Sequence, residues 1–268
     1  MKQVLLNSQH YIDLIGSGTN TFGKEGGQYM AEITMDTTEL NTAIKAGYRH
    51  FDTAVSYRNE SVIGKAIQES GIARDEFFIT SKIPTKPNYV ESTETIQETI
   101  DESLKSLGTK YIDLYLIHHP ADNETNLKVW KVLEKNHEAG LLKTIGVSNF
   151  NQDQLQYIMD HSKVPIAVNQ IESHPGKWQE ELIAFCQNHD IVVEAWGPLT
   201  RVSDEAKAIL NDIGSNYHKT WAQVILNYQV SRQVVVIPKS HNAQRQKDNL
   251  NVFDFQLTPE ERERIQTL

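Results

Sequence analysis

Short apolar segments alternate with longer helix-like segments along almost the whole chain, and this alternation constrains the fold more than any other feature. The apolar segments lack strict in–out alternation, which is typical of parallel strands that are buried on both faces. Strands that alternate with helical patterns predict a parallel sheet covered by helices. Eight segments qualify as strands: 13–19, 50–53, 77–83, 113–119, 144–149, 166–172, 191–197 and 234–240.

The connecting segments carry the periodicity of amphipathic helices. In the segment 91–108, isoleucine and leucine recur at helical spacing, and Gly108 supplies a stop signal. Two further helices are predicted at 204–214 and 220–230, both within the last crossover. Residues 4–12 precede the first strand and suit a small hairpin that could cap one end of a barrel.

A closed barrel and a doubly wound open sheet both satisfy this pattern. No GxGxxG motif opens a helix after any strand, and no Walker loop is present, which weakens the open-sheet alternative. The chain has 268 residues, and (β/α)8 barrels run to roughly 250 residues as one domain. No linker or low-complexity tract divides it. We therefore predict an α/β fold with a single domain over residues 1–268: a (β/α)8 TIM barrel with an N-terminal β-hairpin cap.

Composition and charge exclude several kinds of partner. The formal net charge is −9 and Lys and Arg form no concentrated tract, which argues against nucleic acid and anionic membranes. No apolar run approaches the roughly 20 residues that cross a bilayer, and the N-terminus lacks the pattern of an export signal. Cys186 is the only cysteine, so an internal disulfide is excluded, and its apolar neighbours favour a buried thiol. We expect a cytoplasmic protein, monomeric or weakly dimeric, without a metal.

Ionisable and aromatic side chains gather at the ends of three consecutive predicted strands. The second strand ends at Asp52, and Tyr57 follows on the next loop. Lys82 lies at the end of the third strand, and His118 and His119 end the fourth. Taken singly, each has an ordinary structural role as a turn cap, a solvated amine or a packed ring. In a barrel, however, such strand ends converge on one mouth, where catalytic groups lie.

The chemistry of these groups suits protonation of a developing alkoxide. A phenol with a pKa of about 10 is a poor acid near neutrality, and a nearby ammonium favours phenolate, so we expect it to lower that pKa. Lys82 could supply the ammonium and Asp52 its counter-charge. The imidazole of His118 can hydrogen-bond a carbonyl oxygen and hold it beside Tyr57. No Ser–His–acid arrangement points to acyl transfer instead.

Seven motifs carry a family resemblance: HFDTAVSYRNESVIGKAI, ITSKI, IDLYLIHHP, IGVSNF, AVNQIESHP, EAWGPL and VVVIPKS. With them, in order and near the family spacing, the sequence resembles the aldo-keto reductases, and is similar to the prokaryotic diketogulonate and methylglyoxal reductases. The resemblance implies reduction of an aldehyde or ketone to an alcohol with hydride from NADPH, which leaves NADP+. It implies Tyr57 as the general acid, tuned by Lys82 and Asp52. It also implies that His118 orients the carbonyl.

The resemblance further implies a cofactor site along the remaining strand ends. Trp196 stands where the family usually has an aromatic ring that stacks on nicotinamide, although such a tryptophan could simply pack at the rim. Lys239 and Arg245 could pair with a 2′-phosphate, which favours NADPH over NADH. At the nicotinamide carboxamide, the resemblance implies contacts from Ser148, Asn149 and Gln170; capping of the next helix is the alternative role for Ser148 and Asn149. The other implied contacts are Gly197, Leu199 and Thr200, in the loop expected to contact the pyrophosphate, and Ser240 and Asn249, after the last strand.

Two departures from the family pattern bear on the substrate pocket around His118. Asn20 stands where relatives commonly have tryptophan, and we expect Phe22 to fill part of that space. His119 stands where relatives often have tryptophan. Both changes make the pocket more polar or more open. We therefore expect broad specificity for small carbonyls, with dicarbonyls and sugar-derived ketones as candidates.

Two rival functions stay open at this point. A Schiff-base aldolase on the same barrel would use Lys82 as its nucleophile. A cofactor-sensing regulatory subunit, similar to the channel-associated members of the family, would bind NADPH with negligible turnover.

Overall fold

Eight short parallel strands surround the centre of the molecule in a computed structural model that describes residues 2–268. They pair in chain order, and backbone hydrogen bonds of 2.9 Å from Gly16 to Val236 and from Val236 to Leu14 join the first strand to the last. The predicted (β/α)8 barrel is therefore confirmed. The strands are β3 (Ser17–Gly18), β4 (His50–Asp52), β5 (Phe78–Ile83), β6 (Ile112–Ile117), β7 (Leu142–Ser148), β8 (Val168–Glu172), β9 (Val192–Trp196) and β10 (Val235–Val236).

All eight predicted strand positions hold a strand, but the first and last are much shorter than expected. The segments 13–19 and 234–240 each contribute a strand of only two residues, β3 and β10. The segment just before β3 meets β10 through a single bridge between Ile15 and Val236 and not through a continuous ladder.

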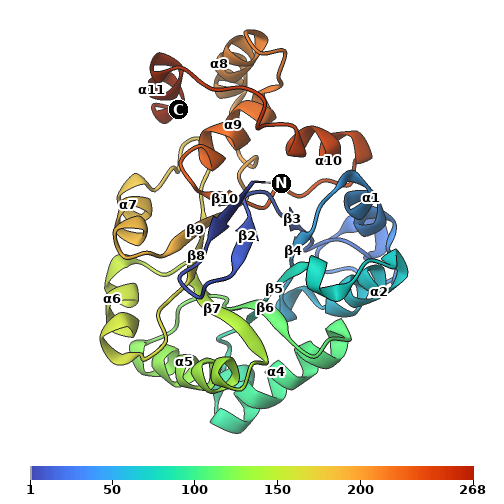
Figure 1. The fold of residues 1–268 in the computed structure, drawn as a ribbon, viewed down its shortest axis with the longest axis vertical. Helices are drawn as coiled ribbons and strands as arrows, with labels where there is room; N and C mark the ends of the chain where they lie inside the picture. The colour runs from blue at the N-terminus through green and yellow to red at the C-terminus, as the bar shows by residue number, and fades with distance from the viewer. Residues whose placement is uncertain (1) are drawn as a thin grey trace.

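Helices form a ring around the barrel, as Figure 1 shows. The predicted helix in 91–108 is observed as α4: the Ser92 side chain accepts a hydrogen bond from the Thr95 amide at its start, and Gly108 ends it with φ of 64°. The full set is α1 (Thr38–Ala46), α2 (Glu60–Ser70), α3 (Pro87–Val90), α4 (Thr93–Leu107), α5 (Asn123–Glu138), α6 (Gln152–His161), α7 (Glu180–Asn188), α8 (Asp204–Ser215), α9 (Trp221–Val230), α10 (Ala243–Leu250) and α11 (Pro259–Gln266).

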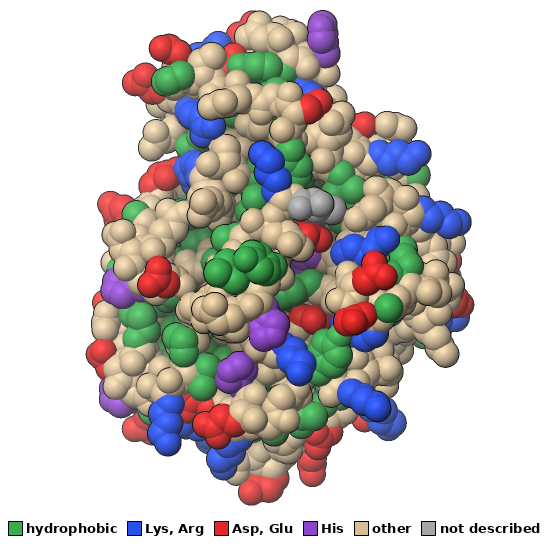
Figure 2. Space-filling model, in the orientation of Figure 1, with side chains coloured by type: hydrophobic (Ala, Val, Ile, Leu, Met, Phe, Trp, Pro, Cys, Tyr) green, Lys and Arg blue, Asp and Glu red, His purple; other side chains and the backbone are tan. Residues whose placement is uncertain are grey.

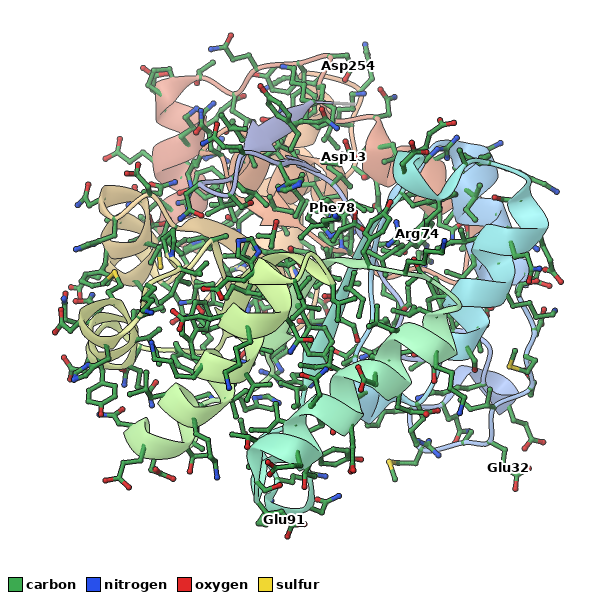
Figure 3. All side chains as sticks on the ribbon, turned by 60° about the horizontal axis from the view of Figure 1, so that its bottom comes forward. Asp13, Glu32, Arg74, Phe78, Glu91 and Asp254 are labelled. Carbon is green, nitrogen blue, oxygen red and sulfur yellow. The ribbon has the colours of Figure 1, made fainter. Side chains whose placement is uncertain are left out.

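An antiparallel hairpin of β1 (Gln3–Leu5) and β2 (Tyr11–Asp13) covers one end of the barrel, as predicted. The Asn7 side chain at its turn donates to the carbonyl of Ile166 at 2.8 Å and ties the hairpin to the barrel. In Figure 3, Asp13 lies toward the hairpin end, whereas Glu32 and Glu91, in the loops after β3 and β5, lie at the opposite end. The hairpin therefore leaves the C-terminal ends of the strands open.

Buried polar side chains on the barrel strands lie beside a large apolar core. Apolar side chains such as Trp130 and Ile145 are buried in a continuous core cluster. Five of the polar or ionisable side chains with 2% exposure or less are linked to one another by contacts across the barrel. Charged groups are almost never buried so fully unless they are paired, so this polar cluster marks a site. Its members are His50, Asp52, Lys82, Gln170 and Glu194.

The surface carries charges of both signs. Figure 2 shows Lys and Arg side chains interspersed with Asp and Glu on the hairpin face. Within residues 2–268, no helix is long and apolar enough to cross a membrane. In the same part of the chain, no group of three or more His, Cys, Asp or Glu is placed to hold a metal ion. Cys186 is buried and free, as expected from its apolar neighbours.

Candidate active site

A cavity of about 510 Å³ opens at the C-terminal ends of the barrel strands. Most side chains that the sequence marked as catalytic, cofactor-binding or pocket residues line this one space. They come from strands and loops that lie far apart in the sequence, so the barrel closure is what brings them together. Those that line it are Asn20, Asp52, Tyr57, His118, His119, Ser148, Asn149, Gln170, Trp196, Gly197, Leu199, Thr200 and Lys239.

A buried ion pair lies directly behind the cavity wall. The Nζ atom of Lys82, on β5, lies 2.7 Å from the Asp52 carboxylate on the neighbouring β4 and donates to the Thr53 carbonyl at 2.8 Å. The Lys82 side chain has no exposed surface. Burial acts to lower the pKa of Lys82, but Asp52, Tyr57 and Glu194 outweigh burial and raise that pKa above its ordinary value. Lys82 is therefore a cation held in place by its neighbours.

Tyr57 lies on a short 3-10 turn, Val55–Tyr57, and its ring centre is 4.9 Å from the Lys82 Nζ atom. The proximity that the sequence predicted is present. The predicted net lowering of the pKa of Tyr57 is wrong: burial raises that pKa, and Lys82 only opposes the rise. Tyr57 is therefore a protonated phenol across the neutral range, and Lys82 lowers the cost of the phenolate left when the proton departs.

His118 packs against Tyr57 beside the cavity in its neutral form. The two rings meet edge to face, with centroids 5.5 Å apart and planes at 82°. Burial, followed by the charge of Lys82, lowers the pKa of His118 to about 2. Its Nδ1 atom is buried and has no hydrogen-bond partner in the described part of the chain. We assign the ring proton to Nε2, because an unpartnered N–H would be costlier to bury than a bare ring nitrogen.

His119 stacks on His118, with ring centroids 4.5 Å apart and planes within 10°. Its Nδ1 atom lies 3.2 Å from the side-chain nitrogen of Asn149, which can only donate, so Nδ1 accepts. Burial lowers the pKa of His119, with Lys82 adding to the effect. The second histidine is therefore also a neutral, polar wall of the cavity.

Glu194 extends the buried polar cluster, and sequence reasoning missed it. Gln170 donates from Nε2 to Oδ2 of Asp52 and to Oε1 of Glu194, both at 2.7 Å. Both amide hydrogens are thereby used, so the amide oxygen is the atom of Gln170 left to serve the cavity. Burial, and then the charge of Asp52, raises the pKa of Glu194 to about 8. An acidic residue within the apolar strand candidate 191–197 was the available signal.

The expectation that Phe22 fills part of the substrate pocket is wrong. Its side chain is fully buried and packs edge-on against His241, with ring centroids 5.2 Å apart, and it is not among the residues that line the cavity. Tyr29 lines the cavity instead and meets the Tyr57 ring at 6.0 Å and 76°. Tyr29 lies in an irregular loop, where no periodicity could have singled it out.

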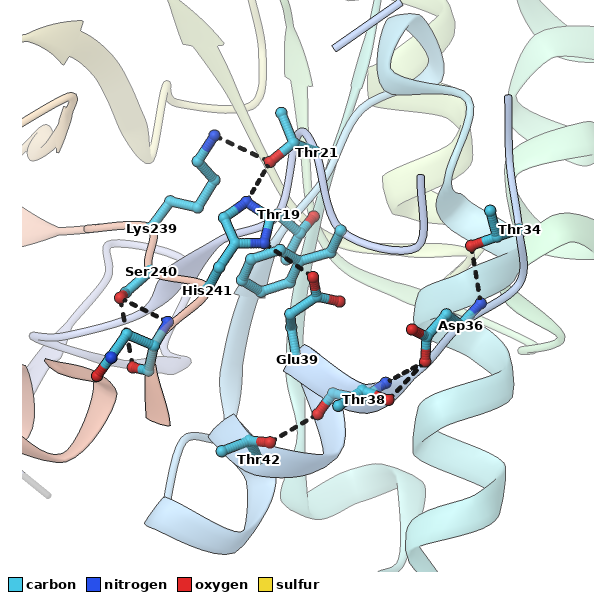
Figure 4. A network of polar contacts seen from close by, with 12 residues as sticks. Thr19, Thr21, Thr34, Asp36, Thr38, Glu39, Thr42, Lys239, Ser240 and His241 are labelled. Atoms are coloured by element: carbon cyan, nitrogen blue, oxygen red, sulfur yellow. Dashed lines mark hydrogen bonds and ion pairs between the residues drawn. The ribbon is translucent and has the colours of Figure 1, made fainter. Parts of the chain in front are cut away.

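Lys239 presents a cation to the cavity without a matching carboxylate. Its Nζ atom donates to Oγ1 of Thr21 and to Oδ1 of Asn20, each at 3.0 Å, and Figure 4 shows the Thr21 contact together with the neighbouring His241. Within residues 2–268, no carboxylate lies within ion-pair distance of Lys239. The site is therefore suited to an anionic group of a ligand.

The loop after β9 forms the opposite rim of the cavity. The indole N–H of Trp196 donates to Oδ1 of Asn149 at 2.9 Å, and Asn149 donates to Oγ of Ser148 at 3.0 Å. Gly197 has φ of 62°, and a Cβ atom there would lie 2.8 Å from Oγ1 of Thr200. A larger residue at this turn would therefore disturb the rim.

The remaining candidates from the last segment lie outside the cavity lining. Ser240 uses its hydroxyl to accept from the Asn242 amide at 3.1 Å. On α10, Arg245 is exposed, whereas Asn249 is buried. These two residues are four apart on one helix, but they differ in what they can offer a ligand.

Comparison with known proteins agrees with this architecture. The family profile described as "Aldo/keto reductase family" matches residues 14–268. The glyoxal reductase of Bacillus subtilis is 39% identical over 243 residues, which cover 90% of this chain and 87% of that relative. This chain therefore belongs to the aldo/keto reductase family.

Solved structures give the same result. An aldo/keto reductase from Brucella melitensis superposes with a TM-score of 0.89 and 38% identity, over 98% of both chains. The Bombyx mori aldo-keto reductase AKR2E4, solved in complex with NADP, has a TM-score of 0.87 and 34% identity, over 98% of this chain and 91% of that chain.

The buried pair makes a prediction about stability. Lys82→Met or Asp52→Asn alone leaves one buried group without its partner, and we expect each variant to lose about 3–5 kcal/mol of unfolding free energy. The double variant should lose clearly less than the sum, because neither uncompensated group is left. Urea unfolding at neutral pH measures all four proteins. Additive losses would show that the two side chains are not energetically coupled.

Proposed function

We propose that residues 1–268 form one reductase domain that reduces aldehydes or ketones to alcohols with NADPH as the hydride source. The single observation that carries the proposal is the arrangement of Tyr57: a protonated phenol lines the cavity with the buried Lys82 cation close to its ring. This arrangement is suited to giving a proton to an oxygen that gains negative charge.

Each catalytic side chain has a distinct role in this proposal. The O–H bond of Tyr57 breaks, and its proton goes to the oxygen of the substrate carbonyl. The phenolate that remains is stabilised by Lys82, and Asp52 holds Lys82 in position at 2.7 Å. His118 donates from Nε2 to the same carbonyl oxygen and orients it. NADPH, when bound, supplies the hydride to the carbonyl carbon.

Several features of the cavity fit a nicotinamide dinucleotide. The amide oxygen of Gln170 is free to accept from a carboxamide N–H, because both of its N–H groups are engaged by carboxylates. Ser148, Asn149 and Trp196 lie around it, and Gly197, Leu199 and Thr200 form the rim. Lys239 offers a cation without a carboxylate, which suits a phosphate. We assign Ser240, Arg245 and Asn249 to the far end of the cofactor, outside the cavity.

For the substrate, we propose small polar carbonyls, including dicarbonyls. The wall beside the proton donor is made of the neutral rings of His118 and His119, with Asn20 nearby, and these groups favour polar ligands over bulky apolar ones. The similarity to the glyoxal reductase of Bacillus subtilis supports this class.

The first functional prediction concerns the proton donor. We expect Tyr57→Phe to lower kcat for carbonyl reduction by about 10²–10⁴-fold, since the ring stays and only the hydroxyl with its acidic proton is removed. Loss of NADPH absorbance measures the rate, and quenching of protein fluorescence by NADPH measures binding, which should stay nearly intact. Undiminished reduction by the variant would mean that another group is the acid.

The second functional prediction concerns the preference for NADPH over NADH. Arg245→Ala should weaken NADPH binding about tenfold and leave NADH binding unchanged, because a guanidinium pairs with the 2′-phosphate that only NADPH carries. Lys247→Ala is the matched control, since it removes another exposed cation from the same helix, α10. Titration calorimetry with both cofactors measures the constants. Equal losses in the two variants would assign the effect to net charge and not to Arg245.

The rival functions are separable from this one. An aldolase needs an unprotonated Lys82, whereas the neighbours of Lys82 raise its pKa and keep it charged. Borohydride trapping of a carbonyl substrate on Lys82 would nevertheless favour the aldolase. Sustained turnover with NADPH would dismiss a regulatory subunit that only binds the cofactor.

A further inference from the structure

The loop between β3 and α1, residues 19–37, contains a buried lysine, Lys24. Lys24 is only 6% exposed. Burial, with added repulsion from Arg58 and Lys239, lowers its pKa to about 8. Within residues 2–268, no carboxylate lies within ion-pair distance of its Nζ atom. Burying an ammonium without a counter-charge costs folding free energy, so we expect Lys24 to have a role that offsets this cost.

Both Lys24 and Arg58 hold the same short stretch of this loop. The Nζ atom of Lys24 donates to the carbonyl oxygen of Tyr29 at 2.7 Å. Nη2 of Arg58 donates to the same oxygen at 3.2 Å and to the carbonyl of Ala31 at 3.1 Å. Charge-assisted hydrogen bonds of this kind are roughly twice as strong as neutral ones. Two cations therefore fix the backbone at Tyr29.

The ring of Tyr29 is fixed as well as its backbone. The Nζ atom of Lys24 lies 4.6 Å from the Tyr29 ring centre, which is a cation–π distance. On the cavity side, the ring meets Tyr57 edge to face, with centroids 6.0 Å apart. Rings at this separation are in contact, so a further ring cannot enter between them. Tyr29 thus closes one side of the space beside the Tyr57 hydroxyl.

Lys24 and Arg58 together form a clamp on Tyr29, and Arg58 joins this clamp to the proton donor through the chain itself. Arg58 directly follows Tyr57 and has φ of 62°, in the left-handed region that residues with a side chain rarely adopt. One short segment therefore carries both the proton donor and a cation that holds the neighbouring residue Tyr29. The position of Tyr29 relative to Tyr57 is set by this segment and not left to a free loop.

We propose that Tyr29 is a specificity-determining residue, a wall held by Lys24 and Arg58 that excludes bulky groups from the side of the cavity next to the Tyr57 hydroxyl. The inference rests on the proposed carbonyl reduction and narrows its substrates to carbonyl compounds with small substituents on that side. In this proposal Tyr29, and not Phe22 as expected from the sequence, fills part of the substrate pocket.

The test compares two dicarbonyls that share the same ketoaldehyde group and differ in its substituent, methylglyoxal with a methyl group and phenylglyoxal with a bulky phenyl group. In the parent protein, kcat/KM should be higher for methylglyoxal. In Tyr29→Ala, the ratio of kcat/KM for phenylglyoxal to that for methylglyoxal should rise about tenfold, mostly through a lower KM for phenylglyoxal. An unchanged or lower ratio would overturn the proposal, because Tyr29 would then be neutral or a platform on which aromatic substrates stack.

Two control variants separate the wall from general damage. Tyr29→Phe keeps the ring, and its ratio should stay within about twofold of the parent. Met30→Ala truncates the next side chain, which is 76% exposed and does not line the cavity, and should also leave the ratio unchanged. A rise in either control as large as that in Tyr29→Ala would overturn the assignment to the Tyr29 ring.

A separate variant tests the part that Lys24 plays in the clamp on Tyr29. Lys24→Met keeps the apolar stem and removes the ammonium, so Tyr29 should loosen and the ratio should rise about threefold, less than in Tyr29→Ala. No change would remove Lys24 from the proposal. A parent protein that reduces neither dicarbonyl nor any other aldehyde or ketone with NADPH would instead refute the proposed function. Reduction with a ratio that does not depend on Tyr29 would refute only this inference.

Discussion

The buried ion pair between Lys82 and Asp52 is the interaction on which the rest of the site depends. Placing two charges where neither is solvated is costly, and proteins tolerate it only when the charges are paired and hydrogen-bonded. Here adjacent strands bring the two groups to 2.7 Å, the Thr53 carbonyl accepts a further hydrogen bond from Lys82, and Gln170 donates one to Asp52. The apolar layer outside the strands supports this arrangement, because it keeps the barrel closed around it. The pair in turn keeps Lys82 positively charged and close to the Tyr57 ring.

Two effects compete at Tyr57, and burial is the larger. A buried phenol resists ionisation, and the nearby Lys82 cation only reduces that resistance, so the pKa of Tyr57 lies above its ordinary value. For a proton donor this balance is useful, since the phenol is fully protonated at neutral pH. The ammonium then acts on the phenolate that proton transfer creates. His118, kept neutral by burial, adds a hydrogen-bond donor without adding charge.

The sequence predicted those parts of the molecule that repeat or that sit at strand ends. Apolar runs located all eight strands, and strand ends located Asp52, Lys82 and His118, because barrel geometry sends those positions to one mouth. Phe22 and Tyr29 were not predictable in this way, since an irregular loop has no period that separates buried from exposed rings. The net direction of the Tyr57 pKa also required coordinates, because burial depends on tertiary packing.

One measurement tests the central claim that the Lys82 cation eases ionisation of Tyr57. Protein labelled with ¹³C at the tyrosine ζ carbon would be titrated by NMR, with Tyr57→Phe used to assign the Tyr57 signal. The account predicts that Tyr57 ionises at a clearly higher pH in folded Lys82→Met than in the parent, because burial and the charge of Asp52 then raise the pKa of Tyr57 without opposition. An equal or lower midpoint in the variant would contradict it.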